Sequence, residues 1–168
     1  MRAGIPGLMI SAFLFTILAL IVAVPLVHQP GMFTGLDGTT GVMDHGWGAE
    51  QFIYALGDMF CHQQTERSFV INGSQTAFCA RDIGIFVGCA LGLVLTYRSA
   101  GRYPFTDRKT MYLGFVLLSV MAAEWAAGTA IGYDMDRLRF AAGAVGGLGI
   151  AMVIQNIASE PWKSEGAS

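Results

Sequence analysis

The sequence predicts an all-α integral membrane protein, a four-helix bundle whose long outer-side loop carries a short amphipathic helix and a polar Cys/His motif. Of the 168 residues, 54% are apolar and only 13% are charged, about half the charged fraction of soluble domains. Four long stretches of the chain carry almost no charge. The net charge of −2 offers no basic surface to nucleic acid, and three cysteines are too few for a disulfide-rich scaffold.

A helix needs about 20 apolar residues to cross the hydrocarbon core of a bilayer. We therefore expect a single membrane domain over 1–168, with spans at about 7–27, 79–97, 110–133 and 140–159, an outer loop 28–78 and an inner loop 98–109. The first span is expected to be a permanent helix, because its apolar stretch exceeds that of a signal peptide. The second must begin near Phe78 or Cys79 to be long enough, which places Arg81 and Asp82 in its first turn.

The orientation follows from the basic residues of the short loop 98–109. This loop holds Arg98, Arg102, Arg108 and Lys109, and short loops rich in Lys and Arg stay in the cytoplasm. With four spans, both termini are then cytoplasmic, and the protein is expected in the cell membrane with residues 28–78 outside.

Within the outer loop, glycines and Pro30 prevent a continuous helix at the start. Apolar residues in Glu50 to Phe60 recur with a period near 3.6, which predicts a short helix on the membrane surface or over the helix ends. Asn72-Gly73 predicts a tight turn between Ser68–Ile71 and the polar run to Gln75.

Small residues at four-residue spacing predict close helix packing, because helices in lipid associate where their backbones can approach. Three spans carry such a face: Gly84, Gly88 and Gly92; Ala122, Ala126 and Ala130; Gly143 and Gly147.

The polar residues that could carry chemistry lie between Cys61 and Asp82. Thiolate, imidazole and carboxylate are ligands of zinc and of several iron sites, so Cys61, His62, Cys79 and Asp82 form a candidate set for a divalent metal ion. If a helix begins at Cys61, His62 and Glu66 share one of its faces. The competing interpretation is a disulfide between Cys61 and Cys79, because the loop is expected outside the cell. The spacings alone leave both open.

Four charged residues are candidates for catalysis. Arg67 and Arg81 either pair with Glu66 and Asp82 or hold the anionic part of a substrate, and Glu66 or Glu124 would move protons. Glu124 lies inside the third span, where a carboxylate is costly unless it is paired, protonated or bound to metal. An ion pair with Arg81 is the structural alternative. We expect Asp134, Asp136, Arg137 and Arg139 to belong to an ordinary charged loop, and His28 and His45 to be loop histidines.

The polar stretch resembles a family of small predicted membrane proteins, domain of unknown function 2085 (DUF2085). The resemblance rests on Cys61-His62-Gln63, Glu66-Arg67-Ser68-Phe69, Gly73-x-Gln75 and Cys79-Ala80-Arg81, followed by Gly84. It extends to Glu124 and to Arg139, Gly143 and Gly147, and covers about 60–149. The family has a cysteine where this chain has Asp82, which weakens a redox dithiol and leaves a metal site viable. The resemblance implies that these groups act as one constellation.

Two functions of different classes follow. The first is a membrane-embedded metal site at the outer leaflet, catalytic toward a lipid or quinone-like molecule that reaches it laterally. The second is a non-enzymatic structural or assembly subunit with a Cys61–Cys79 disulfide and a salt-bridged cap. The expected partners are membrane lipids and a lipophilic small molecule, without nucleic acid, and an oligomer is left open.

Overall fold

The computed structural model describes residues 5–43, 45–99, 108–132 and 135–165, with side chains placed for all of these except 98, 99 and 158–165. It contains four long helices: α1 (Ile5–Val27), α3 (Ala80–Ser99), α4 (Arg108–Ile131) and α5 (Asp136–Glu165). Each is long and apolar enough to cross a membrane, and each covers one of the expected spans. The all-α membrane fold is therefore confirmed.

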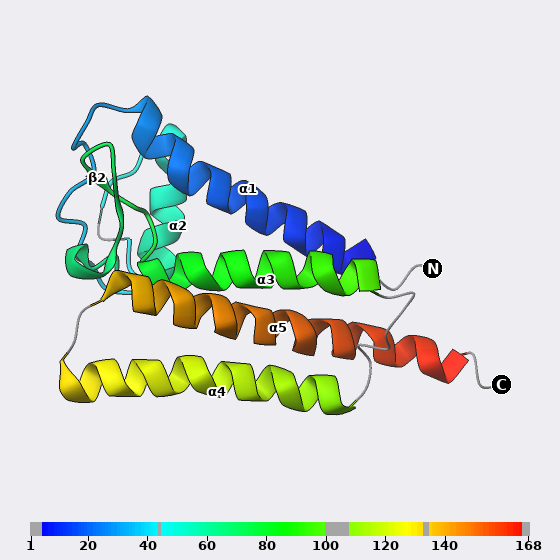
Figure 1. Ribbon diagram of the computed structural model, residues 1–168. Coiled ribbons are helices and arrows are strands. Elements are labelled where there is room, and N and C mark those ends of the chain that lie inside the picture. The colour runs from blue at the N-terminus through cyan, green and yellow to red at the C-terminus, as the bar shows by residue number, and fades with distance from the viewer. Residues whose placement is uncertain (1–4, 44, 100–107, 133–134, 166–168) are drawn as a thin grey trace.

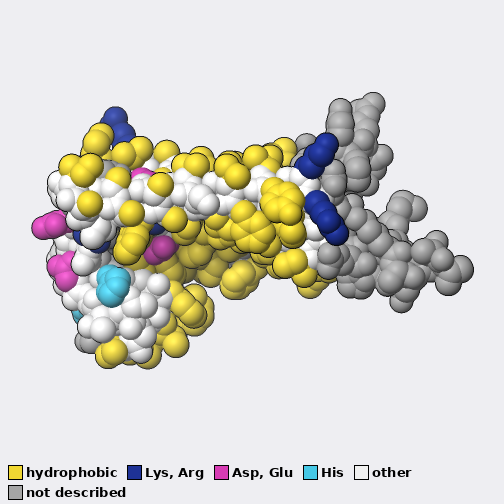
Figure 2. Space-filling model, turned by 90° about the horizontal axis from the view of Figure 1, so that it is seen from below, with side chains coloured by type: hydrophobic (Ala, Val, Ile, Leu, Met, Phe, Trp, Pro, Cys, Tyr) yellow, Lys and Arg dark blue, Asp and Glu magenta, His cyan; other side chains and the backbone are white. Residues whose placement is uncertain are grey.

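The four long helices lie side by side in the order α1, α3, α5, α4, which differs from their order in the chain (Figure 1). The end of α1, the start of α3, the end of α4 and the start of α5 meet at one end of the molecule. Residues 28–79, which we call the cap, cover this end of α1 and α3 (Figure 1). On the face that Figure 2 shows, apolar side chains cover the body and acidic and histidine side chains gather at the cap end.

The contact between α3 and α5 is made by glycines, as the spacing predicts. A β-carbon on Gly84 or Gly88 would collide with the backbone of Phe140 or Ala144. From the side of α5, a β-carbon on Gly147 would collide with the backbone of Ile85 in α3. The two helices are therefore in direct backbone contact over more than one turn.

The prediction that α4 packs through its alanine face is wrong. Ala122, Ala126 and Ala130 are all exposed. α4 packs on α5 through Gly114, whose backbone oxygen lies 2.6 Å from the β-carbon position of Gly149, and through the Met121 side chain against Gly146. The alanine spacing does give α4 a smooth face. Within the described residues, however, the neighbouring helix α5 lies on another side of α4, so the alanine face makes no helix contact.

The cap has its own apolar core, and the short helix predicted at Glu50 to Phe60 is part of it. This helix is a 3₁₀ turn η1 (Ala49–Gln51) followed by α2 (Phe52–Phe60). Ile53 and Tyr54 are buried against Phe33, whose ring stacks on that of Tyr54 at 4.0 Å between centroids. The Tyr54 hydroxyl donates to the Gln75 backbone oxygen at 2.7 Å. The helix thus lies over the helix ends, one of the two positions its periodicity predicts.

The predicted turn at Asn72-Gly73 is also present. Strands β1 (Val70–Ile71) and β2 (Ser74–Gln75) pair antiparallel, and Asn72 and Gly73 have φ of 53° and 71°. Two consecutive positive φ angles are typical of a type I′ hairpin turn. The Asn72 side chain donates to the Pro25 backbone oxygen at 3.0 Å, which fixes the hairpin to the end of α1.

Candidate functional site

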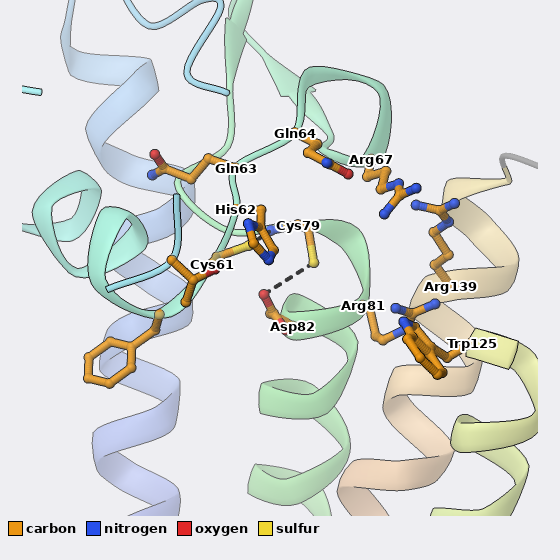
Figure 3. A pocket seen from close by; sticks show the side chains of 12 residues that line it. Cys61, His62, Gln63, Gln64, Arg67, Cys79, Arg81, Asp82, Trp125 and Arg139 are labelled. Carbon is orange, nitrogen blue, oxygen red and sulfur yellow. Dashed lines mark hydrogen bonds between the residues drawn. The ribbon is translucent and has the colours of Figure 1, made fainter. Parts of the chain in front are cut away.

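A cavity of about 200 Å³ lies where the cap meets the first turns of α3 and α5 (Figure 3). Cys61, Cys79 and Asp82 line one part of it, and we call them the thiol–carboxylate cluster. Arg67, Arg81 and Arg139 line another part, and we call them the arginine group. Four elements supply these residues: the loop after α2, the 3₁₀ turn η2 (Thr65–Arg67), α3 with the residue before it, and α5. Segments far apart in the sequence therefore share one polar space.

The thiol–carboxylate cluster brings together three of the four expected metal ligands. One ligand atom from each of Cys61, Cys79 and Asp82 lies within 4.8 Å of the other two. The Cys79 thiol donates to Asp82 Oδ2 at 3.1 Å, and the Cys79 backbone N–H donates to Cys61 Sγ at 3.3 Å. Cys61 is buried, whereas Cys79 and Asp82 are partly exposed toward the cavity.

The chain around Cys61 is held in place by two glutamines. Gln63 is buried, and its side-chain amide donates to the backbone oxygens of Tyr54 at 3.3 Å and Ala77 at 2.9 Å. Gln75 in turn donates from its side-chain amide to the Gln63 backbone oxygen. Gln63 has φ of 45°, a left-handed conformation that is rare outside glycine and that persists only where its surroundings enforce it. These bonds provide that enforcement.

No helix begins at Cys61, so the condition under which His62 and Glu66 would share a helix face is not met. α2 ends there, and Cys61 has extended backbone angles of −136° and 149°. The left-handed Gln63 then turns the chain away from helical geometry, so His62 and Glu66 do not share a helix face. His62 is exposed and lines the cavity, outside the group of three ligand atoms. Glu66 is exposed in η2 and lines a neighbouring surface hollow instead.

Both thiols of the cluster are free, and no disulfide joins them in this structure. The pKa of the Cys61 thiol is raised, first by a side-chain hydrogen bond with the Cys79 thiol and then by burial. The pKa of Cys79 is lowered, chiefly because of its hydrogen bond with Cys61.

In the arginine group, Arg81 forms the ion pair that was the structural alternative for Glu124. Its Nη2 atom donates to Glu124 Oε2 at 2.7 Å, and the two side chains are 20% and 8% exposed. The pair joins α3 to α4 and provides a partner for the carboxylate inside the span, where a lone charge is costly. Arg81 thus pairs with Glu124 rather than with its chain neighbour Asp82.

Sequence reasoning missed three residues of this region. Arg139, expected in an ordinary charged loop, is 5% exposed on α5 and lines the cavity. Its place four residues before Gly143 is the signal that puts it on the α3-facing side of α5. Trp125 follows Glu124 and also lines the cavity. Gln63 belongs to the Cys-His-Gln motif, and its buried side chain fixes the conformation of the loop that follows α2.

His45, expected to be an isolated loop histidine, instead takes part in a buried bond network of the cap. Its ring nitrogen Nδ1 lies 3.2 Å from Asp58 Oδ1, and its backbone N–H donates to the same carboxylate. The Trp47 indole N–H donates to Asp58 Oδ2 at 2.7 Å. Because these donors satisfy the buried Asp58 carboxylate, we assign this network to the stability of the cap.

The comparisons with known proteins agree with this architecture. A family model described as "Predicted membrane protein (DUF2085)" matches residues 61–153, which include the whole thiol–carboxylate cluster and all three arginines. An uncharacterised protein of Methanocaldococcus jannaschii, MJ1492, is 28% identical over 109 residues, which are 61% of this chain and 65% of the relative. The chain therefore spans less than two thirds of that relative. No solved structure matches. The chain belongs to the DUF2085 family of predicted membrane proteins.

Proposed function

We propose that this membrane protein binds a divalent metal ion, zinc or iron, through Cys61, Cys79 and Asp82, and that the metal site acts on a lipophilic molecule that arrives from the membrane. The observation that carries the proposal is the convergence of three ligand atoms from two separate segments within 4.8 Å. In a tetrahedral zinc site with bonds of about 2.3 Å, ligand atoms are about 3.8 Å apart. The cluster is close to this spacing, so small rotamer changes would complete it.

Three protein ligands are typical of catalytic rather than structural zinc sites, because they leave a coordination position open. Here the open position would face the cavity, which Cys79 and Asp82 line. A metal ion bound there supplies Lewis acidity and an activated water. His62 lines the same cavity with an exposed side chain, so it remains the candidate for a fourth ligand; with His62 bound, a catalytic metal ion would take its substrate by expanding to five-coordination.

The four charged residues considered for catalysis would bind substrate or transfer protons. Arg67 and Arg81 line the cavity and would hold the anionic part of the substrate, as guanidinium groups do in pairs with carboxylate or phosphate. Of the two carboxylates considered for proton transfer, Glu124 contacts the cavity through Arg81, whereas Glu66 faces a different hollow. Glu124 is therefore the stronger candidate.

Metal analysis of the purified protein tests this proposal. We expect about one zinc or iron ion per chain in the wild type, loss of the metal in Cys79→Ala, and a lower content in His62→Ala if the imidazole is the fourth ligand. Cys89→Ala is the matched control, because Cys89 is a buried cysteine of α3 outside the cluster. A wild type without stoichiometric metal after growth and purification with added zinc or iron contradicts the proposal.

The second candidate function, a non-enzymatic structural or assembly subunit, is favoured by the Arg81–Glu124 ion pair, which joins two helices without needing a substrate. In that case the neighbouring sulfurs of Cys61 and Cys79 would form a disulfide in an oxidising compartment. Free-thiol counting separates the two functions. Cys61 and Cys79 both blocked to alkylation until reductant is added, in metal-free protein, favour the structural subunit.

A further inference from the structure

A second hollow lies beside the polar cavity and is almost entirely apolar. It has a volume of about 400 Å³, which is within the range of small-molecule sites. Phe13 and Leu14 of α1, Leu56 and Phe60 of α2, and Phe86 of α3 line it. We call it the apolar groove. Asp82, in the first turn of α3, is its one charged lining residue.

The groove exists because α1 and α3 diverge toward the cap. Away from the cap they are close: the Ser11 hydroxyl donates to the Ala90 backbone oxygen at 2.9 Å, and the β-carbon position of Gly7 lies 3.6 Å from Leu93. Toward the cap the two helices separate and α2 lies across the gap (Figure 1). The apolar groove is therefore a consequence of where α2 is held, and it lies between α1 and α3, two of the candidate membrane spans.

The groove and the polar cavity meet at two residues. Phe60 and Asp82 line both spaces. A molecule that extends from one to the other would have an apolar part against Phe13, Leu14 and Phe86, and a polar part against the thiol–carboxylate cluster and the arginine group. This is the shape and polarity of a membrane lipid rather than of a water-soluble metabolite.

We propose that the molecule bound here is an anionic phospholipid, with an acyl chain in the apolar groove and its phosphate against Arg67, Arg81 and Arg139. The inference deepens the proposed function and rests on it in one respect: a bound metal ion would offset the charge of Asp82, which lines both the groove and the polar cavity. The three guanidinium groups give the anionic selectivity, since Arg pairs with phosphate through two parallel hydrogen bonds.

A similar hollow on the other side of the α1–α3 contact provides the comparison. It has a volume of about 410 Å³ and is lined by Leu18 and Val22 of α1 and by Ile83 and Val87 of α3, among other residues. None of its lining residues is charged. An acyl chain lying there would have no arginine for its head group, so this hollow should take lipids without regard to charge.

The test is native mass spectrometry of delipidated protein in detergent, with equal amounts of dioleoyl phosphatidylglycerol and dioleoyl phosphatidylcholine added. We expect the wild type to retain one phosphatidylglycerol with about tenfold preference, and Arg67→Gln and Arg139→Gln to remove most of that preference. Leu14→Trp should fill the groove and abolish retention. Leu18→Trp is the matched control, because both leucines are half-buried on α1 and Leu18 lines only the other hollow. Thermal unfolding of each variant shows that it is folded.

Each outcome decides the inference. Equal retention of the two lipids by the wild type, or equal losses in Leu14→Trp and Leu18→Trp, overturns it. So does displacement of the lipid by inorganic phosphate alone, or preferential retention of a neutral quinone. Metal-free Cys79→Ala separates the two proposals: a preference for phosphatidylglycerol that survives there supports the lipid site even if the wild type holds no metal.

Discussion

Arg81 and Asp82 are neighbours in the chain and both line the polar cavity, yet their other contacts lie on different sides of α3. Arg81 pairs with Glu124 of α4, on the side where α3 lies directly on the backbone of α5. Asp82 joins Cys79 and lines the apolar groove, on the side that faces α1 and α2. One side is closed by glycines and an ion pair, and the other is held open by α2.

The difference between the two sides of α3 explains how a small bundle of membrane helices can leave space for a binding site. Helices in lipid pack where small residues allow backbone contact, so a molecule packed in this way throughout would have no internal space. Here the α3–α5 contact supplies rigidity, and the α1–α3 contact is tight only away from the cap. The predictions below test whether the two sides of α3 differ in the way that the structure indicates.

The largest effect is expected on the closed side, for Gly88→Val. The new side chain would collide with the backbone of Ala144, which cannot move without separating α3 from α5. We expect a loss of about 3 kcal/mol or more in unfolding free energy, or no folded protein. Unfolding in mixed micelles measures it. Wild-type stability in this variant would show that the α3–α5 contact is looser than described.

The ion pair on the same side comes next. Glu124→Ala leaves the Arg81 charge without its carboxylate at the edge of the membrane. We expect a loss of about 2 kcal/mol, less than for a fully buried pair because the Arg81 side chain is 20% exposed. The same unfolding assay measures it, with exposed Glu66→Ala as the control. A Glu124→Ala loss no greater than that of the control contradicts this role.

On the open side, metal affinity should rise with pH. Metal binding requires thiolates. The pKa of Cys61 is raised by its side-chain hydrogen bond with the Cys79 thiol and by burial, so the metal ion must displace the Cys61 proton throughout the neutral range. Each displaced proton raises the apparent affinity about tenfold per pH unit. Competition with a zinc indicator from about pH 6 to pH 8 measures the slope. Cys61→Ser should flatten it, and a flat wild-type profile would exclude thiolate ligation.

Asp82→Cys should increase zinc affinity about tenfold, because thiolate is a better zinc ligand than carboxylate and Asp82 already lies within reach of both sulfurs. Isothermal titration with zinc measures the change. Unchanged affinity in folded Asp82→Cys would place position 82 outside the coordination sphere.

The smallest effect is expected for Gly7→Ala, at the contact between α1 and α3. The added carbon would lie 3.1 Å from the end of the Gln155 side chain, which can rotate away, and 3.6 Å from Leu93. We expect a change in unfolding free energy within about 0.5 kcal/mol. A loss as large as that of Gly88→Val would mean that the two contacts of α3 are equally tight.

The spans could be predicted from the sequence because charge is excluded from lipid, and the glycines of α3 and α5 because backbone contact requires them. The alanines of α4 show where this reasoning ends. Ala122, Ala126 and Ala130 have the right spacing, but which face of a helix receives a neighbour depends on the positions of all the helices. The sequence of one helix does not contain that information.

For the candidate site, the sequence indicated which residues gather but not how the chain turns between them. A left-handed backbone at Gln63 cannot be inferred from the residue type, because glutamine ordinarily avoids that conformation. It depends on the hydrogen bonds that Gln63 forms with Tyr54, Ala77 and Gln75, which the fold brings to it from two other segments. The same turn keeps His62 and Glu66 from sharing a helix face.

The position of α2 has a consequence for how the family could diversify. Cys61, Cys79, Asp82 and the three arginines all fall within the segment 61–153 that defines the family, whereas Phe13, Leu14, Ile17 and Leu56 of the groove lie before it. The groove also draws on this segment through Phe78, Asp82 and Phe86, so the segment supplies those six polar residues and part of the groove, and the stretch before it supplies the rest of the groove. Under the proposed lipid site, relatives that keep the segment 61–153 and change the stretch before it would keep these polar residues while altering the shape of the groove.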